Sequence, residues 1–157
     1  MELDDRLLAT PTIALQQCGQ LAIKMAEETV EGFRLSLQCL SAYADSTAQR
    51  IREIENSTDH YEDILGTYLT QIARCQISED DSSEVSRLLK AIGDLERISD
   101  HSVNVLESVE EMQEKQIAFS AEGKEEMDVL CAALAEIQEV TMDAFRTGDL
   151  EEVYAVE

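Results

Sequence analysis

The segment IREIENSTDHYEDILGTYLTQI, from Ile51 to Ile72, sets the architecture, because its apolar and small residues recur at alternating spacings of three and four. Such a repeat forms one stripe along a helix and is typical of helices that pack side by side. The segment VSRLLKAIGDLERISDHSVNVLESV, residues 85–109, repeats the pattern. We therefore expect two long helices that pack through these stripes. The stripe residues are Ile51, Ile54, Thr58, Tyr61, Leu65, Tyr68 and Ile72, then Val85, Leu88, Ile92, Leu95, Ser99, Ser102, Leu106 and Val109.

A further helix is predicted before this pair. It begins near Thr10 or Pro11, since threonine is a capping residue and proline suits the first helical turn. Its apolar residues continue at helical spacing to about Tyr43. Asp45 and Ser46 then offer side chains that can cap the next helix.

The remaining boundaries follow from capping residues and polar segments. The segment QISEDDSS, residues 76–83, predicts a tight turn between antiparallel helices. The third helix fades near Lys115, and Ser120 starts a fourth helix that runs to Phe145. The segment TGDLEEV, residues 147–153, indicates a break and a new helix start. The fold class is therefore all-α, an antiparallel bundle of three to four long helices.

Composition limits the classes of partner. The chain has 157 residues, of which 44% are hydrophobic, so it can build a core. It carries 34 acidic and 12 basic side chains, a formal charge of -22. This charge repels phosphate backbones and anionic lipid, so we expect no nucleic-acid binding and no direct lipid binding. It favours cations as partners, either metal ions or basic protein surfaces.

The cysteines and the apolar segments point to the cytoplasm. No run approaches the ~18 apolar residues of a membrane-spanning helix, and the N-terminal residues do not resemble a secretory signal. Cys18, Cys39, Cys75 and Cys131 are far apart and form no C-x-x-C pair. We interpret them as buried thiols of a reducing compartment, in preference to disulfides or a zinc site.

An acidic motif, E-x-x-x-D-H, occurs once in each helix of the central pair. The spacing of four places both carboxylates of a copy on one helix face, one turn apart, where like charges destabilise the helix. Both copies flank the apolar stripe and do not enter it. The copies are Glu55, Asp59 and His60 in the first helix and Glu96, Asp100 and His101 in the second.

The two copies are also expected at the same height of the hairpin. Glu55 and Asp100 are equally far along the chain from the centre of the predicted turn, and so are Asp59 and Glu96. Four carboxylates would then share one surface patch. Such oxygen clusters bind divalent cations, and carboxylates suit Mg²⁺, Ca²⁺, Mn²⁺ or Fe. The alternative is a solvated acidic face without metal.

The two histidines are weaker candidates. Each follows an Asp and therefore points about 100° away around its helix. His60 and His101 can be additional ligands, which would favour Zn²⁺, Ni²⁺ or Fe, or they can cap, pack or bind a partner.

Enzyme classes find no support in the sequence. Di-iron bundles use E-x-x-H motifs that point into the core, and this chain has no such motif. We also find no nucleophile–base pair and no glycine-rich phosphate loop. The sequence therefore predicts a non-catalytic protein.

The segment LLKAIGDLERISDHSVNVLE, residues 88–107, resembles the signature of PhoU-like domains. The resemblance implies a three-helix bundle in which E-x-x-x-D pairs on two helices hold a metal cluster at the surface. Glu96 and Asp100 match one pair, and Glu55 and Asp59 match its partner. The resemblance adds Asn104 as a possible further ligand or support, and Arg97 matches the usual arginine after the glutamate.

The first residues carry a second resemblance. The segment LDDRLLATPTIAL, residues 3–15, is similar to the junction that follows the membrane region of bacterial sodium/phosphate cotransporters with a PhoU-like domain. This implies a linker over residues 1–10, a three-helix repeat over 11–117 and, over 118–157, a fourth helix with the start of a truncated second repeat. One metal site is then expected.

The resemblance implies a regulatory, metal-binding domain that controls phosphate transport from the cytoplasmic face of the inner membrane. Its partner would be the transporter's membrane region or a transport-regulatory protein. Two alternatives are a separate PhoU-type regulator of phosphate ABC transport and signalling, and a metal-free helical interaction module. Because the fourth helix lacks the partners of a second repeat, we also expect a homo-oligomer.

Overall fold

The computed structural model describes residues 3–148, and these residues form helices joined by short connections. No strand occurs among them, which confirms the all-α class. In chain order the elements are the 3-10 helix η1 (Asp5–Ala9) and the helices α1 (Pro11–Cys39), α2 (Asp45–Ala73), α3 (Glu79–Glu114) and α4 (Ala121–Thr147).

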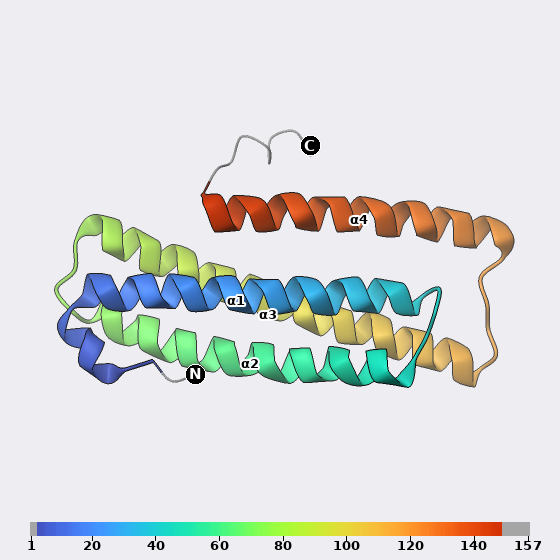
Figure 1. Cartoon of the computed structure of the whole chain (residues 1–157), viewed down its shortest axis with the longest axis horizontal. Coiled ribbons are helices and arrows are strands. Elements are labelled where there is room, and N and C mark those ends of the chain that lie inside the picture. Colours follow the sequence, from blue (N-terminus) through green and yellow to red (C-terminus); the bar gives the residue numbers. More distant parts are fainter. Residues whose placement is uncertain (1–2, 149–157) are drawn as a thin grey trace.

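Helices α1, α2 and α3 pack as an antiparallel three-helix bundle, and α4 lies along the side of α1 (Figure 1). The stripes predicted for α2 and α3 face this core, and nearly all their residues are buried. The buried apolar residues form two clusters. The larger one includes Met25, Leu69 and Leu88, at the end where α2 turns into α3. The smaller one includes Ile51 and Leu106, towards the opposite end.

Small polar side chains occupy the bundle between these clusters. Thr29, Thr58 and Ser99 are buried there. The hydroxyls of Thr29 and Thr58 each donate to the backbone carbonyl four residues earlier, which satisfies a buried polar group within its own helix. Gly32 of α1 lies so close to α2 that an added Cβ would stand 3.0 Å from Cγ2 of Ile54. The helices therefore approach closely at this level.

The turn between α2 and α3 is shorter than the sequence predicted. Ser78 caps α3, because its Oγ accepts a hydrogen bond of 3.0 Å from the backbone N–H of Asp81. Residues 79–83, expected in the turn, therefore belong to the helix. Their acids lie in the first helical turn, where the unpaired N–H groups and the helix dipole stabilise negative charge. Capping by Ser120 at the start of α4 is confirmed.

The connection between α1 and α2 also differs from the prediction. Helix α1 ends at Cys39 and not near Tyr43, whose hydroxyl donates a 3.3 Å hydrogen bond to Glu110 of α3. This contact links the connection between α1 and α2 to α3. The side chain of Thr10 makes no capping hydrogen bond, and Ala44 is the N-cap of α2.

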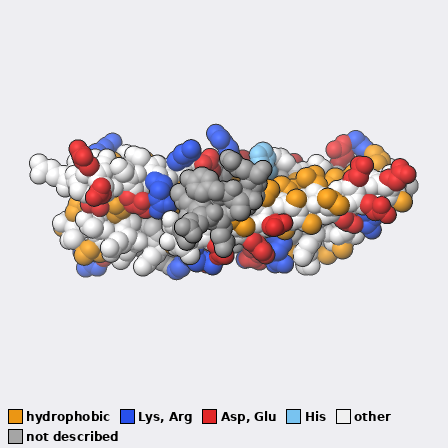
Figure 2. All heavy atoms as spheres, turned by 90° about the horizontal axis from the view of Figure 1, so that it is seen from above, with side chains coloured by type: hydrophobic (Ala, Val, Ile, Leu, Met, Phe, Trp, Pro, Cys, Tyr) orange, Lys and Arg blue, Asp and Glu red, His pale blue; other side chains and the backbone are white. Residues whose placement is uncertain are grey.

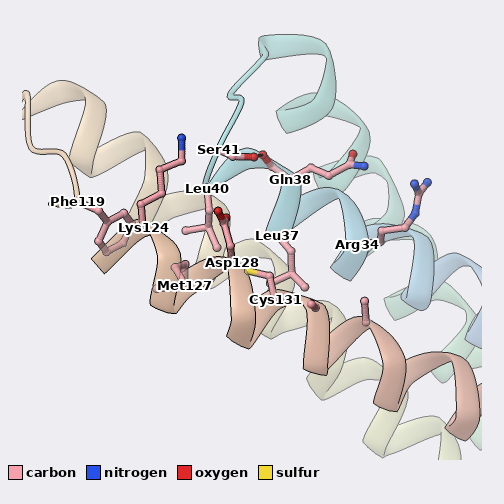
Figure 3. Close-up of a pocket in the computed structure, with 12 residues that line it drawn as sticks. Arg34, Leu37, Gln38, Leu40, Ser41, Phe119, Lys124, Met127, Asp128 and Cys131 are labelled. Atoms are coloured by element: carbon pink, nitrogen blue, oxygen red, sulfur yellow. Dashed lines mark hydrogen bonds between the residues drawn. The ribbon is translucent and has the colours of Figure 1, made fainter. Parts of the chain in front are cut away.

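Helix α4 is not a core helix, and part of its apolar surface is exposed. Met142 is its one buried residue, whereas Leu130 is 52% exposed and Ile137 is 43% exposed. Its C-terminal end is held by an ion pair of 3.3 Å from Arg146 to Glu27. Towards its N-terminal end, a crevice of about 280 Å³ separates α4 from α1 (Figure 3).

The end of α4 agrees with the predicted break. Gly148 has a φ of 75° and its N–H bonds to the carbonyl of Ala144, so it ends the helix in the left-handed conformation that suits glycine. The helix start predicted within residues 147–153 lies outside the described residues.

The cysteines are free thiols. Cys18 and Cys39 are buried, as predicted, while Cys75 and Cys131 are half-buried. Burial raises the pKa of the Cys18 thiol to about 11, which makes it unreactive at neutral pH. Within residues 3–148, no helix combines the length and the apolar character needed to cross a membrane.

Candidate metal site

The four carboxylates predicted as ligands lie on the two facing helices of the hairpin. Glu55 and Asp59 are one turn apart on α2, and Glu96 and Asp100 are one turn apart on α3. Both glutamates are half-buried and both aspartates are exposed, so the four flank the core as expected.

Close packing between the helices positions this group. Thr58 of α2 and Ser99 of α3 are buried beside the carboxylates, and the Ser99 hydroxyl donates to Oγ1 of Thr58 over 3.4 Å. Large apolar side chains at these two positions would hold the helices further apart. The small side chains therefore allow the acidic faces of α2 and α3 to approach each other.

The carboxylates repel one another across the hairpin. Partial burial raises the pKa of Glu55, and the charges of Asp59 and Asp100 raise it further. Partial burial also raises the pKa of Glu96; the charge of Asp100, a hydrogen bond to Asp100 and the charge of Asp59 add to the effect. The pairs expected at equal height, Glu55 with Asp100 and Glu96 with Asp59, are thus within electrostatic range.

Among the described residues, no basic side chain compensates this repulsion. Every influence resolved on the pKa values of Glu55 and Glu96 raises them. The contrast is Glu31, whose pKa is lowered because Arg50 lies at 3.0 Å and hydrogen bonds to it. A bound cation would lower this electrostatic repulsion.

Glu62 is a fifth acid of the cluster that the sequence analysis missed. It is half-buried on α2, and its charge raises the pKa of Glu96. It lies outside the E-x-x-x-D-H motif, which is why the motif search did not select it. Its position, seven residues after Glu55 and three after Asp59, places it on the same helix face. That spacing was the signal available in the sequence.

Comparison with known proteins identifies the family of this bundle. A sequence profile described as PhoU domain matches residues 22–109, more than half of the chain and both acidic motifs. The chain belongs to the PhoU domain family. This is a regulatory, non-catalytic family, and membership points to a role in phosphate homeostasis. No curated protein and no solved structure matches the chain.

The histidines of this PhoU domain are not among the groups that shift the pKa values of Glu55 and Glu96. His60 lines a shallow groove on α2 together with Asp63 and Thr67. His101 is exposed on α3. Among residues 3–148, no hydrogen bond or ion pair links either histidine to Glu55 or Glu96.

Asn104 and Arg97, the other residues that match the family signature, are exposed on α3. The carbonyl of Asn104 accepts a hydrogen bond of 2.8 Å from the Ser108 hydroxyl, and its side chain is one turn beyond Asp100. Arg97 lies 4.0 Å from Asp94. It is not among the groups that shift the pKa values of Glu55 and Glu96.

The donor set of the cluster is carboxylate oxygen. This chemistry fits hard divalent cations, which take several oxygen ligands. In the described part of the chain, however, no three His, Cys, Asp or Glu side chains converge closely enough to hold a metal ion as they stand. The helices place the acids, and binding would require their side chains to change rotamer.

Proposed function

We propose that this PhoU domain is a non-catalytic regulator of phosphate transport that binds divalent cations through Glu55, Asp59, Glu96 and Asp100. The observation that carries the proposal is the group of carboxylates on α2 and α3 whose mutual repulsion no basic side chain of residues 3–148 relieves. A shared cation would remove that repulsion and bind the folded hairpin in preference to the unfolded chain.

The proposed regulatory step is a change in the hairpin. A cation held by side chains of both helices ties α2 to α3, and its loss leaves like charges facing each other across the hairpin. The cation-bound and cation-free states then differ in the rigidity and the charge of this face. A partner that binds one of the two states more tightly would therefore respond to whether a cation is bound. Glu62 belongs to the same acidic face and would add ligand oxygens.

We further propose that the domain acts at the cytoplasmic face of the inner membrane, attached to a sodium/phosphate cotransporter. The resemblance of residues 3–15 to the junction of such proteins supports this attachment. The partner would be the membrane region. A separate regulator of phosphate ABC transport is the second candidate. Membrane-spanning segments encoded in the same reading frame would support the first, and their absence from the intact gene would support the second.

Direct titration tests the metal site. After treatment with a chelator, calorimetric titration with Mn²⁺, Mg²⁺ and Zn²⁺ should detect saturable binding of at least one cation. Glu55→Gln/Glu96→Gln should weaken that binding by at least about tenfold, because two anionic ligands become neutral. The matched control is Glu125→Gln/Glu136→Gln, two exposed acids of α4, which should bind as wild type. Equal binding by both double variants would refute the site.

Phosphate uptake tests the regulatory role. Cells that produce the intact protein with Glu55→Gln/Glu96→Gln should take up labelled phosphate at a different rate from wild type, at equal protein abundance. The Glu125→Gln/Glu139→Gln protein, changed at two exposed acids of α4 outside the acidic cluster, should support the wild-type rate. If a variant that has lost metal binding leaves phosphate uptake unchanged, the cation site does not regulate transport.

A further inference from the structure

Helix α4 carries a second apolar face besides the one it turns towards the bundle. We call it the α4 strip and define it as Val129, Leu130, Ala133, Ile137 and Val140. Val129 is 72% exposed, and Leu130 and Ile137 are exposed by about half. Their spacings of three, four and seven place these residues along one side of the helix. This is the pattern of a helix that packs against another helix.

The α4 strip borders a groove between α3 and α4. A largely apolar cavity of about 310 Å³ lies between α1, α3 and α4. Leu95 and Ile98 line it from α3, and Ile137 lines it from α4. Because Ile137 belongs to both, the cavity and the strip form one continuous apolar surface. Figure 2, seen from the α4 side, shows hydrophobic side chains gathered along this side of the molecule, with acids between and around them.

The charges beside the α4 strip are negative, whereas the α3 side also carries Arg97, 4.0 Å from Asp94, and Arg87, which lies over the ring of Phe145. Glu122, Glu126 and Glu136 are exposed beside the α4 strip on the same helix, and Asp94 of α3 lines the cavity. The two basic residues of α4 lie elsewhere. Lys124 lines the crevice on the α1 side of the helix (Figure 3), and Arg146 pairs with Glu27 and Asp143.

From this arrangement we propose that the groove between α3 and α4 binds an amphipathic helix of another protein that carries Lys and Arg beside its apolar stripe. The apolar stripe would cover the α4 strip and the cavity, and the basic side chains would meet Glu122, Glu126 and Glu136 on the α4 rim. A second copy of this chain fits less well, because each copy carries a formal charge of -22 and would place acids against acids. Anionic membrane surfaces are disfavoured for the same reason.

Two model peptides test the proposal with the full chain. The first is an 18-residue amphipathic helix of Leu and Lys, and the second has the same pattern with Glu in place of Lys. Fluorescence anisotropy should show binding of the Lys peptide that weakens as salt is added, and at least about tenfold weaker binding of the Glu peptide. Equal binding of the two peptides would overturn the role of charge.

Variants locate the binding surface. Leu130→Ser/Ile137→Ser should weaken binding of the Lys peptide by at least about tenfold, since two apolar contacts are lost. Ile13→Ser, a change of a 46% exposed residue on α1, is the control and should bind as wild type. Should the double variant lose helicity, Ala133→Arg provides the same test, because Ala133 is exposed and the change adds a repelling charge to the strip.

Two double variants with the same change in charge test whether the peptide binds in the groove or is attracted to the acidic protein as a whole. Glu126→Gln/Glu136→Gln should weaken peptide binding several-fold, whereas Glu53→Gln/Glu107→Gln, the same charge change on α2 and α3, should have little effect. Equal weakening by both pairs would mean that the peptide has no defined site. Light scattering that shows a dimer, dissociated by Leu130→Ser/Ile137→Ser, would assign the strip to a second copy and overturn the proposal.

Discussion

Among single residues, Glu55 and Glu96 are candidate ligands because of their positions on the facing helices α2 and α3. Both belong to a chain rich in acids, yet their pKa values are raised by partial burial and by acids of the opposite helix. The sign of the resulting pH dependence follows. When the pKa of a carboxyl is higher in the folded state than its ordinary value of 4.5, the folded protein binds a proton more tightly than the unfolded chain does. The free energy of unfolding therefore falls as the pH rises above 4.5.

The first prediction concerns the metal-free protein. Glu55→Gln/Glu96→Gln should be more stable than wild type at pH 7, by about 0.2–0.5 kcal/mol for each like-charged pair removed. Its stability should also change less between pH 5 and pH 7. Urea unfolding with a chelator at both pH values measures the effect. A double variant that is less stable than wild type at pH 7 would contradict the repulsion.

The second prediction concerns the neighbouring residues Asp59 and His60. His60→Ala should leave metal affinity unchanged, because His60 is not among the groups that shift the pKa values of Glu55 and Glu96. Asp59→Asn should weaken it, because Asp59 acts electrostatically on both Glu55 and Glu96. Calorimetric titration of the two variants compares adjacent positions of one helix. A large loss in His60→Ala would show that the histidine is a ligand.

Single elements show which parts of the fold the sequence determines. The stripes of α2 and α3 were predicted well, since a helix buried along one side leaves a regular period in its apolar residues. Helix ends were predicted less well, because they depend on contacts from other elements. Tyr43, in the connection after α1, donates a hydrogen bond to Glu110 of α3, for example. Local capping matters too, because Ser78 caps α3 and thereby shortens the turn that precedes this helix. The spacing of apolar residues in α4 indicates a helix, but how much of its apolar surface is buried depends on which elements pack against it.

The third prediction compares two glycines of α1. Gly19→Ala should stabilise the protein by about 0.5–1 kcal/mol, because an added Cβ meets nothing within 4 Å and alanine favours the helix. Gly32→Ala should destabilise it by about 1 kcal/mol, because its Cβ would press on the buried side chain of Ile54. Chemical unfolding of both variants gives the comparison. Equal stabilisation by the two changes would mean that α1 and α2 are not closely packed there.

For the whole molecule, the antiparallel hairpin is what made the candidate site visible in the sequence. Two straight helices joined by a short turn fix which residues share a height, so the positions of Glu55 and Asp100 along the chain were enough to match them. The spacing of Glu62 from Glu55 and Asp59 was readable in the sequence, whereas its electrostatic effect on Glu96 of the other helix became visible only in the three-dimensional arrangement. The homo-oligomer expected from the sequence would use the exposed side of α4, so it is the alternative to the helical partner proposed for the α4 strip.

Thermal unfolding is the measurement that tests the proposed cation site most directly. A cation at about 100 times its dissociation constant adds about 2.7 kcal/mol to the folded state, which corresponds to a rise in Tm of roughly 5–10 °C for a chain of this size. Wild type and Glu125→Gln/Glu136→Gln should show this rise when Mn²⁺ or another binding cation is added to chelator-treated protein. Glu55→Gln/Glu96→Gln should show none and keep its helical circular dichroism. An undiminished rise in that variant, or no rise in wild type with any divalent cation at millimolar concentration, would contradict the account.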